Sequence, residues 1–513
     1  MDKSWKDKAE EYLKTSHKYR LGVLPTEGFH PLTHNLSQLA KNDLPQAVDI
    51  LQQVDFKIFS VLQQQVDQIK ELQAEIQEVF KNGGRVFLCG CGATGRLSLT
   101  LDYLWKESFP NNKNQVVSFM SGGDVALVHS IEGFEDFPQY GSDHLVQLGF
   151  TEKDMLISCT EGGETPYVIG ATNRAAQLSD YNTYFLYCNP DEVLLNIQRS
   201  KEVLENKKIK KINLNVGPMA LSGSTRMQAS SILLMAVGLA LFETENDILI
   251  NINKFEEFYK KYDLNFMPSF IQEESNIYLG SGYLIYDVDE FAITVFTDLT
   301  ERAPTFNLRA FERDISGDIT GVSAKGNSLC YVHIKGAHNI EESWRLLLNR
   351  EPHCLDWPEH SKMTTKTYMQ GFDFSSTVFD NRLNRTGNEN QIFKILMQDK
   401  NKVKLELGKQ SHTMGLTGQG ILYDHLLLKM ILNIHSTLIM GILGRYENNV
   451  MSWVKPTNGK LIDRSARYVA KILQAKNIEP SYEEIVCAIF KNMDQVGNQQ
   501  SIVLMVVDEF KPQ

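Results

Sequence analysis

The sequence predicts an α/β protein with two parallel-sheet αβα sandwich domains, the second of them degenerate, and with N- and C-terminal helical segments that form a cap. Short apolar runs of strand length alternate with helix-length segments from residue 85 onward, which is typical of a parallel sheet covered on both faces. A second, weaker series of apolar runs follows the first. A chain of 513 residues is also too long for one hydrophobic core.

We divide the chain into four parts on this basis. They are an N-terminal helical segment at 1–56, a first, ligand-binding domain at 57–247, a second, degenerate domain at 248–408 and a C-terminal helical cap at 409–513. Helical periodicity over about 36–82 ends at Asn82-Gly83-Gly84, a usual C-terminal signal. The first series of strands is expected at 85–90, 115–120, 154–159, 183–188 and 209–216. The second series is expected at 276–282, 291–299, 328–336, 375–380 and 402–408, and its first two runs stand too close for a helical crossover.

The composition excludes several classes of function. A formal net charge of −11 argues against a broad nucleic-acid or acidic-membrane surface, because both need an excess of Lys and Arg. The seven cysteines form no CxxC pair and predict reduced, buried thiols of a cytoplasmic protein. The N-terminus lacks an apolar signal core, and the apolar runs at 232–242 and 426–443 are predicted to be buried helices, not membrane spans. No histidine spacing predicts a metal site, and we expect no cofactor.

The first candidate ligand loop, GCGATGR at 90–96, lies between a predicted strand and a predicted helix. Its glycines let the backbone approach a ligand, and the free N–H groups at a helix start attract an anion. The spacing also satisfies GxGxxG, but Asp124, which ends the next strand region, lies 29 residues after Gly95 and fits a ribose-binding acid poorly. A nucleotide-dependent oxidoreductase and a tight turn without ligand therefore stay open as alternatives.

Two further loops, TEGGETP at 160–166 and LSGSTRM at 221–227, also follow predicted strands and precede helices. Hydroxyl groups and helix starts suit a phosphate, whereas Glu161 would repel one unless it turns away or meets a hydroxyl or amine. The alternative is that these residues only cap helices, with Arg226 paired to a nearby acid. Because the carboxyl ends of parallel strands share one edge of a sheet, we expect the three loops to converge on one phosphate.

An acidic cluster, Glu132-Gly133-Phe134-Glu135-Asp136, lies between the second and third predicted strands. A carboxylate at the same edge of the sheet would bind sugar hydroxyls or move a proton. A solvated acidic turn is the alternative.

Five segments together resemble a known family. They are PTE at 25–27 with HPLTHNL, then GCGATGRL, SGGDVALVHSIEGFED, GGETPYVIGA and GPMALSGSTRM, in this order. They are similar to the sugar-isomerase (SIS) domain family, and within it to the branch of N-acetylmuramic acid 6-phosphate etherase and glucokinase regulatory protein. The resemblance implies flavodoxin-like SIS domains and covers about residues 25–240. The two-domain length favours the regulatory protein over the shorter etherase.

The resemblance implies a set of site residues. A lysine at the start of the cap reaches the sugar phosphate in the regulatory protein, and Lys409 matches that position here. The sugar-phosphate-binding residues are then Cys91, Gly92, Ala93, Thr94, Glu135, Thr160, Gly162, Glu164, Thr165, Ser222, Ser224, Thr225, Arg226 and Lys409.

Departures from the family pattern bear on catalysis. The etherase uses two glutamates; the second matches Glu135, whereas the first falls on Leu104, with Glu107 one helical turn further on. Ala93 replaces a hydroxyl residue, and Met219 replaces the glutamate after Gly-Pro. The sequence therefore predicts a sugar-phosphate sensor or regulator similar to glucokinase regulatory protein, with a sugar kinase as one partner to consider. The alternative is an etherase-like lyase or an aldose–ketose isomerase with Glu135 as its base.

Overall fold

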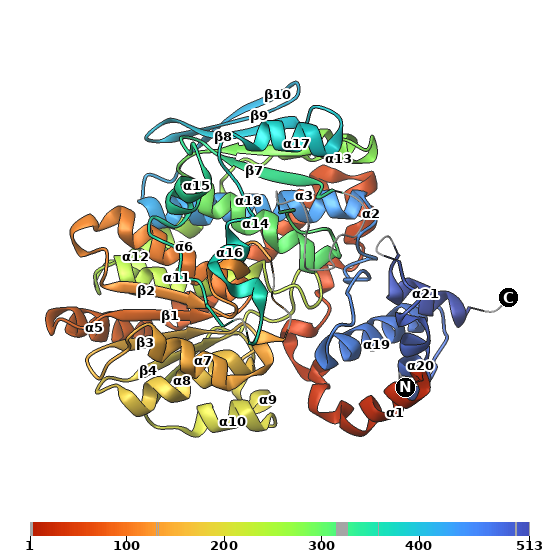
Figure 1. Cartoon of the computed structure of the whole chain (residues 1–513), viewed down its shortest axis with the longest axis horizontal. Helices are drawn as coiled ribbons and strands as arrows, with labels where there is room; N and C mark the ends of the chain where they lie inside the picture. Colours follow the sequence, from red (N-terminus) through yellow and green to blue (C-terminus); the bar gives the residue numbers. More distant parts are fainter. Residues whose placement is uncertain are drawn as a thin grey trace.

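Two five-stranded sheets with a layer of helices between them form the body of the protein (Figure 1). The structure, a computed structural model, describes residues 4–129, 131, 133–313, 327–357, 359–497 and 500–511. Glu132 of the predicted acidic cluster lies outside these residues.

The first sheet is parallel throughout and has the strand order β2-β1-β3-β4-β5, as in flavodoxin-like folds. Its strands are β1 (Val86–Gly90), β2 (Val116–Met120), β3 (Met155–Cys159), β4 (Thr183–Tyr187) and β5 (Ile209–Asn213), so all five predicted strands are confirmed. Alternate residues of β1 face opposite layers: Val86 and Leu88 belong to the large core shared with the second sheet, and Phe87 and Cys89 to a smaller outer core.

Helices cover both faces of this sheet. The inner face packs against α5 (Val66–Lys81), α6 (Ala93–Ser108) and α11 (Gln228–Phe242). The outer face packs against α8 (Pro166–Leu178), which in turn holds α7 (Pro138–Gln147) and α10 (Gln198–Glu205). The predicted αβα sandwich is therefore confirmed.

The second sheet repeats the strand order of the first but not all of its connections. Its strands are β6 (Leu284–Val288), β7 (Cys330–Ile334), β8 (Gln391–Asp399), β9 (Lys402–Leu407) and β10 (Gln410–Gly415). Counted from β7, the order β7-β6-β8-β9-β10 matches that of the first sheet. The pairs β7–β6 and β6–β8 are parallel, whereas β8, β9 and β10 form antiparallel hairpins. Hairpins thus replace two helical crossovers, as expected of a degenerate copy.

Three strand predictions in this half are wrong. Residues 276–282 include the end of α13 (Met267–Leu279), 291–299 lie mainly in α14 (Ala292–Phe306), and 375–380 run into α17 (Val378–Thr386). The run FAITVFTDL at 291–299 is mostly apolar and β-branched, and periodicity alone does not separate such a short run from a strand. β8 was not predicted, because several of its side chains are exposed and its apolar run is broken.

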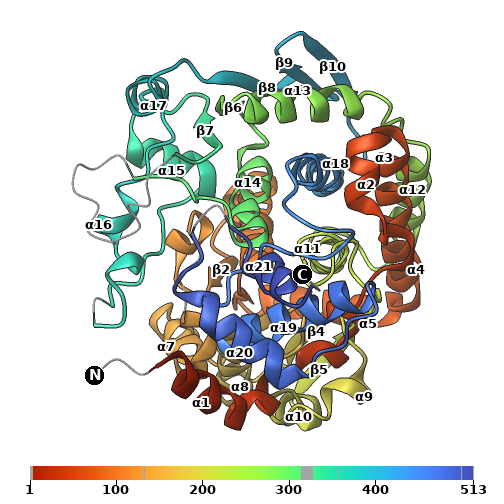
Figure 2. The ribbon, with the colours of Figure 1, turned by 90° about the vertical axis from the view of Figure 1, so that its right-hand side faces the viewer.

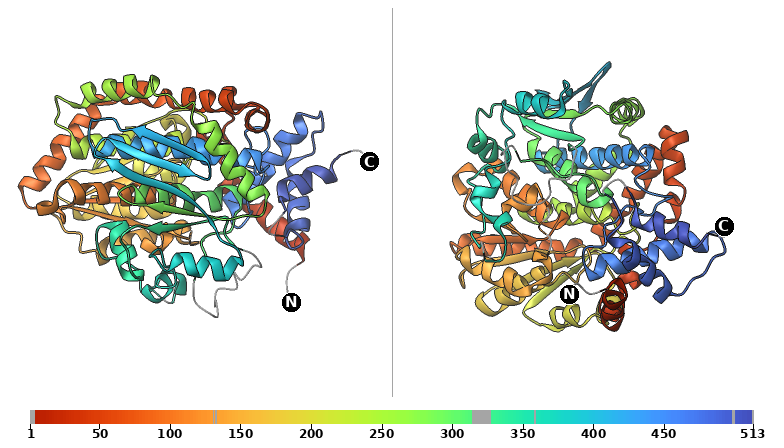
Figure 3. Two further views of the ribbon diagram at one scale, coloured as in Figure 1. Left: turned by 90° about the horizontal axis from the view of Figure 1, so that it is seen from above. Right: turned by 45° about the vertical axis from the view of Figure 1, so that its right-hand side comes forward.

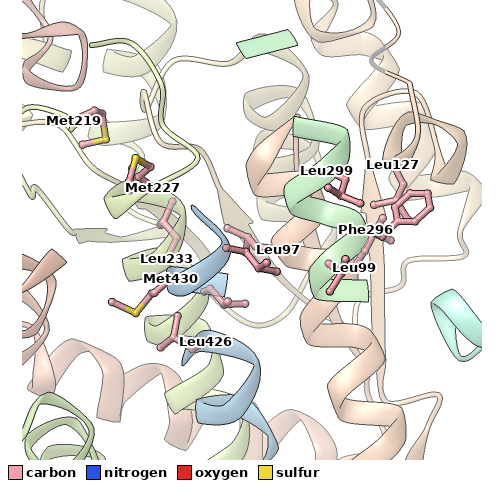
Figure 4. Close-up of a cluster of buried hydrophobic side chains, with 14 of the residues drawn as sticks. Leu97, Leu99, Leu127, Met219, Met227, Leu233, Phe296, Leu299, Leu426 and Met430 are labelled. Atoms are coloured by element: carbon pink, nitrogen blue, oxygen red, sulfur yellow. The ribbon is translucent and has the colours of Figure 1, made fainter. Parts of the chain in front are cut away.

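A central helix, α18 (Ile421–Ile442), lies between the two sheets and packs against α2 (Leu36–Asn42), α11, α13 and α14. Figure 2 looks along it, and Figure 4 shows Leu426 and Met430 of α18 among core side chains such as Leu233 and Leu97. α18 is long and apolar enough to cross a membrane by composition, but 94% of its most apolar window is buried in the protein. The predicted cap at 409–513 therefore begins too early, since β10 belongs to the second sheet and α18 to the core.

Three C-terminal helices, which we call the cap helices, lie beside the first sheet (Figure 3). They are α19 (Gly459–Gln474), α20 (Tyr482–Met493) and α21 (Ile502–Glu509). The N-terminal helix α1 (Trp5–Thr15) packs on α20, and the Tyr12 hydroxyl donates to the Gly459 carbonyl (3.1 Å). The remaining α-helices are α3 (Leu44–Asp55), α4 (Lys57–Gln64), α9 (Asp191–Leu194), α12 (Ile248–Lys260), α15 (Ile340–Leu348) and α16 (Lys366–Met369).

Candidate functional site

The first loop forms a tight turn at the start of α6. Gly92, with φ +56°, precedes the helix, and no other heavy atom would contact a Cβ there. The Thr94 hydroxyl accepts from the Cys91 N–H and donates to the Cys91 carbonyl, both at 2.9 Å, so it closes the turn. In the first turn of α6 the Thr94 N–H donates to the Cys91 carbonyl (3.2 Å), whereas the N–H groups of Ala93 and Gly95 have no partner within the helix and remain for an anion.

The acidic turn meets this first loop. The Cys91 thiol donates to the Glu135 carboxylate (Sγ–Oε2 3.5 Å). Burial and the nearby Glu135 charge raise the pKa of the Cys91 thiol. Glu135 itself is half-buried, as a residue in contact with both solvent and ligand would be.

The second loop follows β3 and is held from several sides. The Thr160 and Thr165 hydroxyls hydrogen-bond each other at 3.0 Å. The Asn189 amide donates to the Gly162 carbonyl at 3.1 Å. Glu164 is 3% exposed and forms ion pairs with Arg199 and with Lys460 (Nζ–Oε1 3.3 Å). Burial alone would raise the pKa of Glu164, but these two cations hold it below its usual value.

The third loop joins the second. The Thr225 hydroxyl lies near the Glu161 carboxyl and acts to lower its pKa, while the neighbouring Ser224 hydroxyl is buried without a hydrogen-bond partner among the described residues. The Ser222 hydroxyl instead donates to the Glu27 carbonyl at 2.9 Å. Gly223 has φ +72°, and a Cβ there would lie 2.3 Å from the Tyr468 hydroxyl, so no side chain fits.

Arg226 is placed elsewhere than predicted. Its guanidinium donates to Asp298 (2.9 Å) on α14 and to Ser436 (2.9 Å) and Thr437 (2.7 Å) on α18. This is the alternative in which Arg226 pairs with an acid. The residue therefore ties the third loop to the core and is not available to a phosphate.

Lys409 is also misplaced in the prediction. It is exposed in the turn between β9 and β10, at the edge of the second sheet away from the carboxyl ends of β6, β7 and β8. The lysine that comes from the cap helices is Lys460, the second residue of α19. The Glu164 carboxylate raises its pKa, and Glu135 adds to this effect. Asn458, whose side chain accepts from the Leu461 N–H, signals the start of α19 in the sequence, but no local pattern connects Lys460 with Glu164.

Glu27, in the PTE segment, fastens α19 to the first domain. Its carboxylate accepts from Arg464 (Nε–Oε2 3.0 Å) and Arg467 (Nη2–Oε2 2.9 Å). Burial alone would raise the pKa of Glu27, but the two guanidinium groups lower it to about 2. The same segment reaches the second loop through Asn189: the Thr26 N–H donates to the Asn189 side chain (3.1 Å), which in turn donates to the Gly162 carbonyl.

The other residues that the sequence comparison with etherases and nucleotide-binding proteins singled out lie outside this site. Leu104 is fully buried in the core, roughly 15 Å along α6 from the helix start. Glu107 is exposed near the far end of that helix and accepts from the Asn349 amide at 2.7 Å. Asp124, considered as a ribose-binding acid, is buried and bound to Arg350. Met219 is part of the core.

In the part of the chain that the structure describes, no group of three or more His, Cys, Asp or Glu side chains is placed to hold a metal ion. All seven cysteines are free thiols.

Comparison with known proteins points to one family. The family model described as glucokinase regulatory protein N-terminal SIS domain matches residues 67–176. The N-acetylmuramic acid 6-phosphate etherase of Thermosynechococcus vestitus is 34% identical over 218 residues, covering 42% of this chain and 66% of that protein. The etherase of Crocosphaera subtropica is 31% identical over 221 residues, 42% of this chain and 67% of that protein.

The overlap with such relatives is partial. The matched region spans 64% of the etherase of Vibrio atlanticus, just under two thirds of its length, at 31% identity. Among solved structures, a tagatose-6-phosphate ketose/aldose isomerase from Escherichia coli aligns over 78% of this chain and 94% of its own, with 9% identity and a TM-score of 0.41. That structural likeness is too weak to carry an argument.

A parallel sheet in this order, with glycine- and hydroxyl-bearing loops at its carboxyl edge, defines a flavodoxin-like α/β domain. The chain belongs to the SIS-domain family, in the branch of glucokinase regulatory protein and N-acetylmuramic acid 6-phosphate etherase.

Proposed function

We propose that this chain binds a phosphorylated sugar and acts as a sensor or regulatory protein similar to glucokinase regulatory protein. The observation that carries the proposal is the meeting of loop residues with a lysine from the cap helices. Lys460 lies against Glu164 of the second loop, and the third loop reaches the second through Thr225 and Glu161. An anion placed there would meet hydroxyl donors, a helix start and one ammonium group.

Each part of the site has a proposed role. The phosphate would accept from the first-turn N–H groups of α6 and from hydroxyls of the second and third loops, including Ser224. Glu135 would bind sugar hydroxyls, and Lys460 would take the role that the sequence analysis gave to Lys409. Release of Lys460 from Glu164 would accompany binding, since a phosphate dianion competes with the carboxylate for the ammonium.

Binding at this site would reach the cap helices by two contacts. Lys460 is itself part of α19, and the Ser222 N–H donates to the Asn449 carbonyl (2.9 Å) in the segment between α18 and α19. A ligand that shifts the third loop would therefore change how the cap helices pack. We propose that this packing change is the signal to a protein partner, for which a sugar kinase is the first candidate. We expect the protein to act in the cytoplasm, without binding nucleic acid or a membrane.

The second candidate function is a lyase or isomerase that acts on an amino-sugar phosphate. This function is favoured by the sequence similarity to N-acetylmuramic acid 6-phosphate etherases and by the position of Glu135 beside Cys91. Against it, the first etherase glutamate is replaced by the buried Leu104, and a general acid or base typically contributes about 10²- to 10⁴-fold.

A thermal-shift screen followed by incubation separates the two candidates. Hexose 6-phosphates, hexosamine 6-phosphates and N-acetylmuramic acid 6-phosphate are tested with the full chain, and a ligand at 100 times its Kd should stabilise by about 2.7 kcal/mol. Stabilisation with no product over hours supports the sensor. Turnover that disappears in Glu135→Gln supports the enzyme. If no sugar phosphate shifts the melting temperature, both candidates are wrong.

A further inference from the structure

Glu161 is a carboxyl group in a position where a phosphate-binding site would not be expected to tolerate one. It follows Thr160 in the second loop, is 8% exposed, and its backbone carbonyl is fixed by the Cys188 N–H at 3.1 Å. Its Oε1 atom is buried and has no hydrogen-bond partner among the described residues. A buried polar atom without a partner costs free energy and needs an explanation.

The third loop has a second such atom. The Ser224 hydroxyl, 4% exposed, lies next to Thr225, whose own hydroxyl lies near the Glu161 carboxyl. Two unpartnered polar groups therefore lie on two loops that touch each other. Both are at the carboxyl edge of the first sheet, where the proposed phosphate site lies.

The surroundings of Glu161 disfavour its ionised form. Burial is the largest effect, and together with Glu301 it raises the pKa of Glu161 to about 7, against the lowering effects of its own backbone N–H, Thr225 and Lys460. The groups that face it from the packed elements are Cys159 of β3, Cys188 after β4, Arg96 of α6, Thr225 of the third loop, Glu301 of α14 and Lys460 of α19.

We propose that Glu161 acts as a carboxylic acid, with its proton donated in a hydrogen bond to the phosphate of the ligand. A protonated carboxyl has an O–H donor, whereas a carboxylate only accepts and repels the dianion. On binding above neutral pH, Glu161 takes one proton from solvent and shares it with a phosphate oxygen. The inference rests on the proposed function and adds that the ligand site selects a phosphate dianion together with a proton.

The test is calorimetric titration of the full chain with the sugar phosphate that responds in the thermal-shift screen. Titrations at pH 8.5 in two buffers of different ionisation enthalpy give the number of protons taken up. Wild-type protein should take up nearly one proton, and its Kd should rise about tenfold between pH 7 and 8.5, since ionised Glu161 must be protonated first. At pH 8.5 a free sugar phosphate is a dianion, because its second pKa is about 6.

The informative variant is Glu161→Gln, which keeps the shape and an N–H donor but cannot titrate. It should bind with less than threefold change in Kd over the same pH range and with no proton uptake. The matched control is Glu152→Gln, an exposed glutamate at the opposite edge of the same sheet, which should keep the proton uptake.

Three outcomes overturn the inference. Proton uptake that persists in Glu161→Gln would place the proton on the phosphate or on another group. Wild-type binding without proton uptake would show that Glu161 stays ionised. Either of these two results overturns the inference but leaves the proposed function standing. Binding of none of the sugar phosphates at pH 6 or 8.5 overturns the proposed function and the inference together.

Discussion

Lys460 is the single side chain on which ligand binding should depend most. It is the cation that the cap helices bring to the second loop, 3.3 Å from Glu164. Replacing it by Met keeps most of its length and removes the charge. A hydrogen bond to a charged group contributes about 1.5–3 kcal/mol, so we expect Lys460→Met to weaken sugar-phosphate binding about 10- to 100-fold in calorimetric titrations at pH 7.

The matched control is Lys409→Met, which changes the lysine that the sequence predicted for this role. Lys409 is exposed in a hairpin turn of the second sheet. The Kd of Lys409→Met for the sugar phosphate should therefore equal that of the wild type within twofold. A loss of affinity in Lys409→Met and none in Lys460→Met would contradict the site described above.

What the sequence reveals of individual residues depends on whether their partners are local. The positions of Thr160, Thr165 and Ser224 between a strand and a helix could be predicted, because that pattern is contained in a dozen residues; their role in binding stays a prediction. Arg226 and Lys460 could not, because their partners Asp298 and Glu164 lie far away along the chain. A polar side chain at a helix start serves a ligand or a distant ion pair equally well, and only the fold decides.

At the scale of one element, the attachment of α19 rests on the ion pairs of Glu27 with Arg464 and Arg467. Breaking a buried pair by removing one partner typically costs about 3–5 kcal/mol. Glu27→Gln should therefore lower the free energy of unfolding by about 3 kcal/mol at pH 7 and speed proteolysis within the cap helices. Urea unfolding and limited proteolysis measure the two effects.

The pH dependence of this effect has a definite sign. The pKa of Glu27 is lowered to about 2, so its contribution is complete above the usual carboxyl value of about 4.5 and is lost as the pH falls toward 2. Wild type and Glu27→Gln should thus converge in stability between pH 4.5 and 2. Glu483 is exposed on α20, so the free energy of unfolding of Glu483→Gln should equal that of the wild type at every pH. A constant gap between Glu27→Gln and the wild type down to pH 2 would contradict the ion-pair explanation.

Elements were predictable where their burial gave them a clear pattern. The five strands of the first sheet are short, apolar and separated by helix-length segments, and all were found. The start of α14 was taken for a strand because the run at 291–299 is mostly apolar and β-branched, and the polar residues of this helix are buried instead of forming an exposed stripe. β8, β9 and β10 form a hairpin sheet with exposed residues, so only the better-buried β9 stood out.

At the scale of the whole molecule, the two sheets share one core. The large cluster of buried side chains includes residues of both sheets and of the helices between them, and Arg96 and Arg226 of the first domain bond to Thr300 and Asp298 of α14. We therefore expect the full chain to unfold in one cooperative transition. A fragment of residues 1–247 should lack a cooperative thermal transition and a near-ultraviolet circular dichroism signal, because α11 would lose its contact with α18.

The comparison uses the full chain as its reference under the same conditions. A fragment that unfolds cooperatively and still binds the sugar phosphate would contradict the shared core. The sequence predicted two successive domains, and it could not show that they share a large core, because the helix that joins them, α18, comes after both sheets.

The hairpins of the second sheet limit how many ligands one chain can hold. β9 runs opposite to its neighbours, so its carboxyl end leaves the sheet on the other side from those of β6, β7 and β8. β10 runs parallel to β8 again, so the counterpart of the third loop does return to that edge. The counterpart of the second loop is reduced to the turn at 400–401, which has no glycine or hydroxyl group and starts no helix. For the proposed function we therefore expect one sugar phosphate per chain, although the architecture is a duplicated one.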